Sequence, residues 1–124
     1  MAQKRILVVD DEQNVLKVLD QRLSKTGYAV LKANNGEDAI FLAKKEKPDL
    51  ILLDLMMPDI SGADVAAALK QDPGTKNIPV IFLTCLVTKN DEEHIGRESG
   101  GNFFIAKPYE PNDLLGEIQK RISE

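Results

Sequence analysis

The 124-residue sequence predicts an α/β fold, a doubly wound sheet of five parallel strands with helices on both faces. Two observations predict it. Short, unbroken runs of branched apolar residues recur along the chain, as expected for strands that are buried on both faces. Segments with apolar residues at helical spacing stand between these runs, and such alternation implies right-handed crossovers between parallel strands.

Five apolar segments are the expected strands. Their lengths fit buried strands, which typically run for about four to eight residues. Three are continuous apolar runs, and two are weaker members of the set. The continuous runs are Ile6–Val9, Leu50–Leu53 and Val80–Leu83, and the weaker ones are Tyr28–Leu31 and Phe103–Ala106.

The first two helices are predicted from apolar spacing and from signals at their ends. An apolar residue recurs at every fourth position from Val15 to Leu23, and Gly27 stands where a C-terminal cap is expected. Asn35 precedes a second helix. This helix should end near Lys47-Pro48, because the residue before a proline avoids helical backbone angles.

Two later helices have similar signals. Ser61 can cap a third helix, since Asp64 follows three residues later as in a capping box. Asn112-Asp113 opens the last helix, whose apolar residues form one stripe from Leu114 to Ile122.

Residues 88–99 are a poor element between the fourth and fifth strands. Val87 and Ile95 are nearly the only apolar anchors there, and Gly96 lies inside the segment. An interior glycine costs about 1 kcal/mol relative to alanine, and few apolar anchors bury little surface. We expect a short or mobile helix.

Length and composition indicate a single domain, residues 1–124, that can bury a core without disulfides or a structural metal. Cys85 is the single cysteine, which excludes an intramolecular disulfide. The net charge of −4 argues against direct nucleic-acid binding. The N-terminus lacks the apolar region of a signal peptide, and no apolar run approaches the roughly 18 residues of a membrane span. We therefore expect a cytoplasmic domain without membrane contact.

Chemically active residues stand where the expected strands end. In an open parallel sheet, ligands bind outside the carboxyl ends of the strands. The first strand ends in Asp10-Asp11, the third in Asp54, the fourth in Thr84 and the fifth in Lys107-Pro108. We expect three carboxylates, a hydroxyl and an ammonium group to converge at one edge of the sheet.

Asp54 is the most informative of these residues. It lies in the apolar run Leu52–Met57, where an unpaired buried charge would cost several kcal/mol. An aspartate after a strand is commonly a helix N-cap, but the next helix cannot begin before Ser61. A partner for this charge is therefore expected.

Asp10 and Asp11 have two interpretations, and both stay open. One is capping of the helix that begins near Glu12. The other is metal binding, because two adjacent carboxylates opposite Asp54 concentrate negative charge that a cation would offset. Oxygen ligands at few positions suit Mg²⁺. The single cysteine and the single histidine stand on different segments, which argues against zinc.

Four motifs resemble the receiver domains of bacterial two-component response regulators, including the single-domain chemotaxis regulators. They are Val8–Glu12, Leu52–Gly62, Thr84 and Lys107-Pro108, and they fall in the family's order over essentially the whole chain. The resemblance implies a flavodoxin-like (βα)5 fold with strand order 2-1-3-4-5. It also implies a phosphorylation-dependent switch that catalyses only its own phosphorylation and dephosphorylation.

The resemblance assigns the chemistry to particular residues. Asp54 resembles the phosphoacceptor, which takes a phosphoryl group from a sensor histidine kinase, a phosphotransfer protein or a small acyl phosphate. Asp11, Asp54 and the backbone carbonyl of Met56 resemble ligands of Mg²⁺, with Asp10 acting directly or through water.

Three further residues have roles implied by the resemblance. Lys107 would offset charge on the phosphoryl group. Thr84 would turn its hydroxyl onto a phosphoryl oxygen, and Phe104, at the switch-aromatic position, would move with it. These movements would alter the surface formed by the fourth helix, fifth strand and last helix. A homodimer through that surface is left open, as is the downstream effector.

The sequence departs from the family in three places. Met56 and Leu86 are apolar where polar side chains often line the approach of water, and Cys85 is bulkier than the usual alanine. Ile95–Arg97 replaces a common alanine-leucine helical face. We expect these differences to affect the lifetime of the signal and the output surface rather than the phosphorylation chemistry.

Other functions on the same fold agree less well with the sequence. A small Mg²⁺-dependent phosphatase with an aspartyl nucleophile would need a substrate cap and an Asp-x-Asp pattern on the first strand, which Asp10-Asp11-Glu12 is not. A flavin-binding domain would need a loop rich in glycine and hydroxyl residues after that strand. A degenerate receiver would lack some of the acidic, threonine and lysine positions, all of which are present here. We expect any output domain to follow Glu124.

Overall fold

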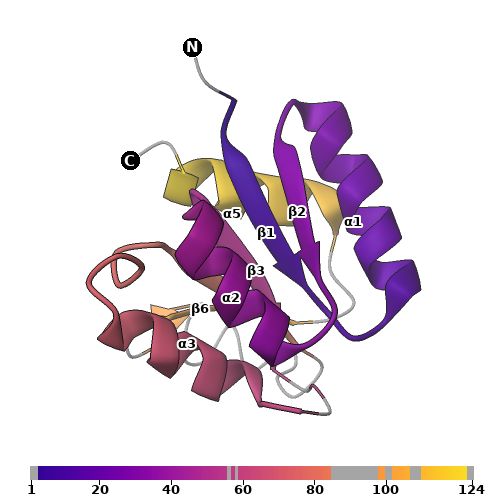
Figure 1. Ribbon diagram of the computed structural model, residues 1–124. Coiled ribbons are helices and arrows are strands. Elements are labelled where there is room, and N and C mark those ends of the chain that lie inside the picture. The colour runs from indigo at the N-terminus through magenta and orange to yellow at the C-terminus, as the bar shows by residue number, and fades with distance from the viewer. Residues whose placement is uncertain are drawn as a thin grey trace.

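The computed structural model describes residues 3–55, 57, 59–84, 98–99, 102–106 and 110–122 (Figure 1). The elements are β1 (Arg5–Val9), α1 (Gln13–Thr26), β2 (Ala29–Ala33), α2 (Gly36–Glu46), β3 (Leu50–Asp54), α3 (Gly62–Gln71), β4 (Val80–Thr84), β5 (Glu98–Ser99), β6 (Asn102–Ala106) and α5 (Pro111–Ile122). Within the described ranges, none of the helices has the length and apolar character that crossing a membrane requires.

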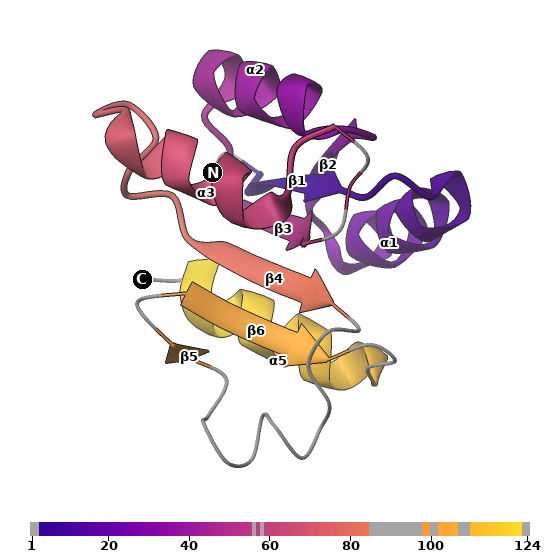
Figure 2. The same ribbon diagram turned by 90° about the horizontal axis from the view of Figure 1, so that it is seen from below.

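Five parallel strands form the sheet, in the order β2-β1-β3-β4-β6. Counted along the chain, this is the predicted order 2-1-3-4-5, and the predicted fold class is confirmed. The chain leaves β1 for β2 on one side and returns to β3 on the other side of β1 (Figure 2). The strand order therefore reverses between β1 and β3, which is where a sheet of this kind binds its ligands.

A sixth strand, β5, extends the sheet beyond β6 in the antiparallel direction. Glu98 pairs with Phe103, and Ser99 pairs with Asn102. The prediction of a helix over residues 88–99 is wrong at Glu98 and Ser99, where the backbone pairs as a strand; the remainder, 88–97, lies outside the described residues. The two residues between the paired positions are both glycine, a composition typical of a tight hairpin connection.

Helices cover both faces of the sheet, with α1 and α5 on one face and α2 and α3 on the other (Figures 1 and 2). Successive residues of β1 alternate between the two layers. Ile6 and Val8 pack with residues of α1 and α5, whereas Leu7 and Val9 pack with residues of α2 and α3. Because both faces are covered, the central strands are apolar at nearly every position, as their sequences predicted.

Capping residues stand at the helix ends that the sequence predicted: two begin helices and one ends a helix. The Asn35 side chain accepts a hydrogen bond of 2.8 Å from the backbone N–H of Asp38, and the Ser61 hydroxyl accepts one of 3.2 Å from that of Asp64. Gly27 ends α1 with φ of 107°, in the left-handed region that glycine adopts without steric cost. These caps fix where α1 ends and where α2 and α3 begin.

Candidate functional site

Three carboxylates meet at the carboxyl ends of β1 and β3. Asp10, Asp11 and Asp54 each offer an oxygen atom, and these oxygens all lie within 4.8 Å of one another. Asp54 is the last residue of β3, and Asp10 directly follows β1, the neighbouring parallel strand. Asp10 and Asp54 are buried, whereas Asp11 is exposed. The structure thus brings the three predicted carboxylates together at one edge of the sheet.

Backbone hydrogen bonds fix the position of Asp10. Its Oδ1 accepts a bond of 2.9 Å from the N–H of Glu12, and its own N–H donates to the carbonyl oxygen of Ala33 at 3.2 Å. Glu12 occupies the N-cap position of α1, but its side chain makes no capping bond. Asp10 therefore orders the entry into α1 while belonging to the carboxylate cluster. The two interpretations of this residue are compatible, because a carboxylate has two oxygens with several acceptor sites.

The carboxylate cluster suits a hard divalent cation. Like charges within about 4–6 Å disfavour each other's ionised form, and a cation among them removes that repulsion. Mg²⁺ binds proteins through one or two carboxylates, keeps several of its waters and contacts phosphate oxygens. A set of three carboxylates, one of them exposed to solvent, fits this mode of binding.

The loop after Asp54 is closed at its base. The Gly62 N–H donates to the carbonyl oxygen of Leu55 at 2.9 Å. Gly62 also lies so close to β3 that a Cβ atom added to it would stand 2.3 Å from the carbonyl oxygen of Asp54. A glycine is required at this close approach of two backbone segments. As a result, α3 begins directly against the backbone of Asp54.

Asp59 ties the same loop to α2. Its carboxylate oxygens accept hydrogen bonds from the backbone N–H groups of Gly36 (3.0 Å) and Glu37 (3.1 Å), which begin α2 and have no partner inside the helix. The bond from Gly36 is the largest cause that holds the pKa of Asp59 below its ordinary value of 3.8; the loss of hydration acts in the opposite direction. The role of this residue was not predicted from the sequence, because its partner lies 23 residues away and no motif or residue spacing indicates the bond.

Phe104 packs on the side of the sheet that α2 and α3 cover. Its ring stacks on that of Phe82, with the centroids 5.1 Å apart and the planes at 23°. Among the described residues, these rings, Leu55 and part of α3 line a hollow of about 450 Å³. The residue predicted as the switch aromatic is thus partly buried and lies beside the base of the Asp54 loop.

Thr84 ends β4, and its backbone pairs with Ala106, the last residue of β6. Since β4 also pairs with β3, the backbone of Thr84 lies at the same edge of the sheet as Asp54. The other predicted site residues lie outside the described residues, so their roles stay predictions. These residues are Met56 and Lys107; Cys85 and Leu86, where the sequence departs from the family, also lie outside the described residues.

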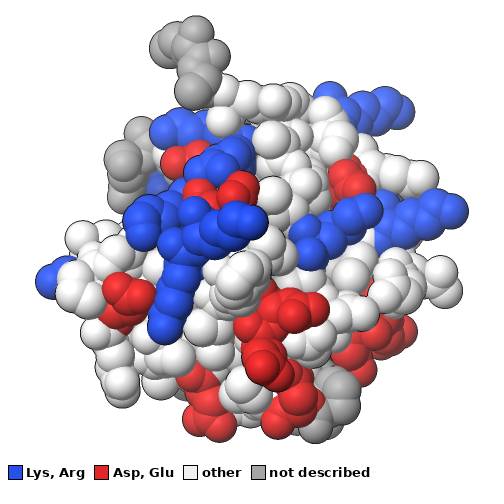
Figure 3. Space-filling view, in the orientation of Figure 1, with Lys and Arg blue, Asp and Glu red and all other residues white. Residues whose placement is uncertain are grey.

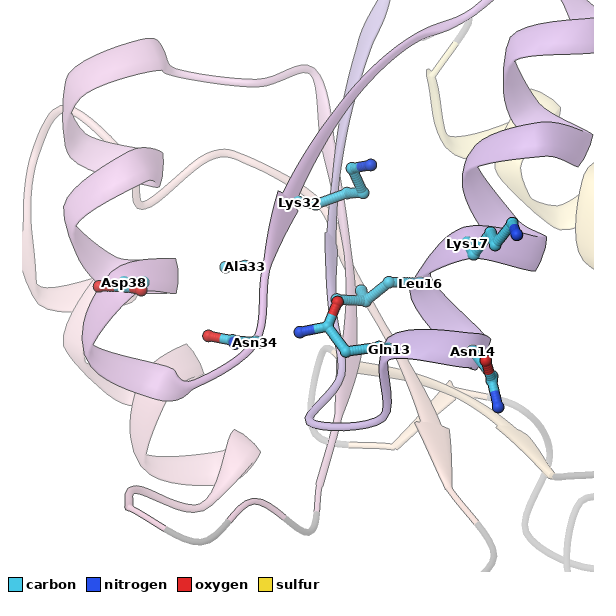
Figure 4. Close-up of a pocket in the computed structure, with 8 residues that line it drawn as sticks. All are labelled: Gln13, Asn14, Leu16, Lys17, Lys32, Ala33, Asn34 and Asp38. Carbon is cyan, nitrogen blue, oxygen red and sulfur yellow. The ribbon is translucent and has the colours of Figure 1, made fainter.

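A cleft of about 650 Å³ lies beside the end of β2 (Figure 4). It lies between the start of α1, which contributes Gln13, and the end of β2, which contributes Lys32. Lys32 is held by an ion pair of 3.0 Å with Asp20 of α1. The backbone bond between Asp10 and Ala33, which also lines the cleft, connects it to the cluster.

The sequence pattern of the response regulator receiver domain matches residues 6–119. The chain belongs to this family. Receiver domains are signalling domains of two-component systems, in which they work with histidine kinases and effectors, and they are not enzymes in the ordinary sense. The predicted family is thereby confirmed.

Individual relatives differ in length. The chain is 36% identical over 119 residues to PhoP of Bacillus subtilis, an alkaline phosphatase synthesis transcriptional regulatory protein, and the match covers 94% of this chain and 47% of PhoP. It is 37% identical over 121 residues to the polar-differentiation response regulator DivK of Brucella anthropi, with 98% of both proteins covered. The chain therefore spans about half the length of several curated relatives it matches and almost all of DivK.

A solved relative has a metal in its site. The receiver domain of a sensor histidine kinase from Pseudomonas aeruginosa, crystallised with a magnesium ion coordinated in its active-site cleft, is 27% identical to this chain. The two structures agree with a TM-score of 0.86 over 99% of this chain and 100% of that one.

Proposed function

We propose that this receiver domain accepts a phosphoryl group on Asp54 from a sensor histidine kinase or a phosphotransfer protein, with Mg²⁺ bound at the carboxylate cluster. The observation that carries the proposal is the approach of Asp10, Asp11 and Asp54 to within 4.8 Å at the switch point of the sheet. The magnesium ion in the Pseudomonas receiver domain supports the choice of metal.

The residues of the cluster would divide the work as follows. A carboxylate oxygen of Asp54 forms the new bond to phosphorus, while the bond from phosphorus to the histidine nitrogen of the donor breaks and that nitrogen keeps the electron pair. Asp11, Asp54 and the backbone carbonyl of Met56 would hold the metal, with Asp10 acting directly or through water. Mg²⁺ bound there supplies positive charge that offsets the charge of the transferring phosphoryl group.

The rest of the site would turn phosphorylation into a signal. Lys107 contributes a second positive charge to the phosphoryl oxygens. Thr84 and Phe104 respond to the phosphoryl group, and the surface around β6 and α5 changes with them. The modified state is the product, and its reader is a downstream effector. Domain boundaries at residues 1–124, a cytoplasmic location and the lack of direct nucleic-acid binding are parts of the same proposal.

A phosphorylation assay tests this function. Incubation with Mg²⁺ and acetyl phosphate should add the mass of one phosphoryl group, and Asp54→Asn or removal of Mg²⁺ by a chelator should abolish the addition. Asp64→Asn is the matched control, because Asp64 is an exposed aspartate in the first turn of α3 and lies outside the carboxylate cluster. Unchanged phosphorylation of the Asp54→Asn protein would contradict the proposal.

A further inference from the structure

The outward face of α2 carries an ordered set of exposed side chains. Two acids come first, one aromatic residue stands in the middle and two bases come last; the set is Glu37, Asp38, Phe41, Lys44 and Lys45. All five positions lie on one stripe of the helix, since residues three and four apart are neighbours on a helix surface. Figure 3 shows the same separation of charge, with Lys and Arg side chains gathered over the C-terminal end of α2 and Asp and Glu side chains around its N-terminal end. We call this stripe the α2 face.

The centre of the α2 face is unusually apolar for a position open to water. Phe41 is 61% exposed, and within the described part of the chain only one other large hydrophobic residue, Val18 at 44%, is classed as exposed. The Lys45 ammonium lies 5.7 Å from the centroid of the Phe41 ring, near the outer limit of a cation–π contact, and leaves most of the ring uncovered. Covering this ring would remove apolar surface from water.

The charges of the α2 face are symmetric about Phe41. Glu37 and Lys45 each lie four residues from Phe41, and Asp38 and Lys44 each lie three residues from it. If a second α2 packs antiparallel with Phe41 opposite Phe41, every acid of one helix lies opposite a base of the other. A surface of this kind is self-complementary under two-fold symmetry.

We propose that the α2 face is a self-association surface, on which the α2 helix of a second copy of this chain packs antiparallel across a two-fold axis at Phe41. The two phenylalanine rings stack at the axis. Glu37 pairs with Lys45 of the second copy on each side of it. This inference does not depend on the proposed phosphorylation chemistry.

The charges alone would not carry this inference. Acids in the first turn and bases in the last turn of a helix also stabilise that helix by itself through its dipole. That effect does not place an exposed aromatic ring at the midpoint between them. Glu37 and Lys45 are also available, since neither forms an ion pair within the part of the chain that the structure describes, whereas Lys44 lies 3.9 Å from Asp72.

The exposed face of α1 lacks this charge complementarity. It carries Val18 together with Lys17, Arg22 and Lys25 and has no acid in its first turn. With Val18 at a two-fold axis, antiparallel packing would place Arg22 of one helix opposite the uncharged Asn14 of the other, so no pair of opposite charges would flank the axis. Charge complementarity therefore selects α2 over α1 as the surface for a second copy.

The association should be weak, because one helix from each partner buries less than the roughly 1,200–2,000 Å² of a standard stable interface. The measurement is sedimentation velocity of the full chain over a wide range of concentration. We expect a monomer–dimer equilibrium that weakens as salt is raised, since the flanking pairs are exposed to solvent. A protein that stays monomeric at the highest concentration reached would overturn the proposal.

Variants on the α2 face make the test specific. Phe41→Ser should raise the dissociation constant by about tenfold or more, as expected for a central aromatic residue of an interface. Val18→Ser is the matched control, an exposed apolar residue on the opposite layer, and should leave the constant unchanged. Circular dichroism melting checks that both variants fold. We expect them to fold, because both substituted side chains are exposed.

A charge exchange tests the antiparallel arrangement itself. Glu37→Lys should weaken the dimer, because it places two bases opposite each other on both sides of the axis. Adding Lys45→Glu to the same chain restores opposite charges and should restore the dimer. If the dissociation constant is unchanged by Phe41→Ser and by both charge variants, the dimer forms through another surface, such as β6 and α5, and the assignment to α2 is wrong.

Discussion

Asp59 accepts a hydrogen bond of 3.0 Å from the backbone N–H of Gly36, which lies 23 residues earlier in the chain. This contact joins the loop that follows Asp54 to the first turn of α2. The loop is closed at its base by the bond between Gly62 and Leu55. It is therefore held at Leu55 by the first residue of α3 and at Asp59 by the start of α2. The segment that follows Asp54 is thus anchored to a helix that contributes no residue to the carboxylate cluster.

Loss of the Asp59 contact should slow phosphorylation without removing any proposed metal ligand. Asp59→Ala leaves two N–H groups of α2 without their acceptor and removes the contact between residue 59 and α2. Because small misplacements of reacting groups are costly, we expect phosphorylation by acetyl phosphate to slow by roughly tenfold. Asp59→Asn keeps one acceptor oxygen and should recover part of the rate, while Asp64→Ala should match the wild type. Equal rates in all four proteins would show that the loop needs no tie to α2.

The same carboxylate should make stability depend on pH in a defined direction. Its pKa is lower in the folded protein than its ordinary value of 3.8, mainly because of the Gly36 bond. A group with a lowered folded pKa stabilises the fold above its unfolded pKa and loses that contribution as the pH falls through the folded pKa. Urea unfolding should therefore show the wild type more stable than Asp59→Asn near neutral pH, with the difference shrinking below about pH 4. A difference that grows on acidification would contradict the assignment.

Signals that lie within a few residues of each other predicted most of the fold. Asn35, Ser61 and Gly27 act on backbone groups next to them, and the sequence placed all three caps. The order of the strands followed from the family resemblance. The carboxylate cluster was predictable because parallel strands bring their carboxyl ends to one edge.

The features that were missed depend on contacts distant in sequence or on an ambiguous signal. The bond from Gly36 to Asp59 and the packing of Gly62 against Asp54 join segments that come close together only in the folded chain. The pairing of Ser99 with Asn102 was missed although two glycines stand between these residues in the sequence, a composition typical of a hairpin connection.

Mg²⁺ should stabilise the wild type and act much less on Asp11→Asn. A ligand that binds only the native state at one hundred times its dissociation constant contributes about 2.7 kcal/mol, which a thermal melt resolves easily. Asp11 is exposed, so the variant should fold. When a chelator removes Mg²⁺, Asp11→Asn should be more stable than the wild type, because the substitution removes one of the carboxylates that repel each other. An equal Mg²⁺ shift in both proteins would move the metal away from this residue.

The phosphorylated state should be long-lived. Met56 and Leu86, which are apolar at positions where the family often has polar side chains, cannot orient a water molecule for attack on phosphorus. We expect slow loss of phosphate and faster loss in the double variant Met56→Asn, Leu86→Glu, measured as a decay after the phosphodonor is removed at constant Mg²⁺. The interpretation fails if this variant accepts phosphate normally and loses it no faster than the parent.

The close approach of Gly62 to Asp54 means that a substitution outside the carboxylate cluster can disturb the proposed phosphoacceptor. Any side chain at position 62 meets the carbonyl oxygen of the proposed phosphoacceptor at 2.3 Å, so one missense change there acts on the site through the backbone alone. Such a variant would keep every acidic residue of the carboxylate cluster. Gly62→Ala therefore gives a protein of unchanged charge, larger by one CH2 group, in which the backbone at Asp54 or at the start of α3 must shift, and we expect it to accept phosphate more slowly than the parent.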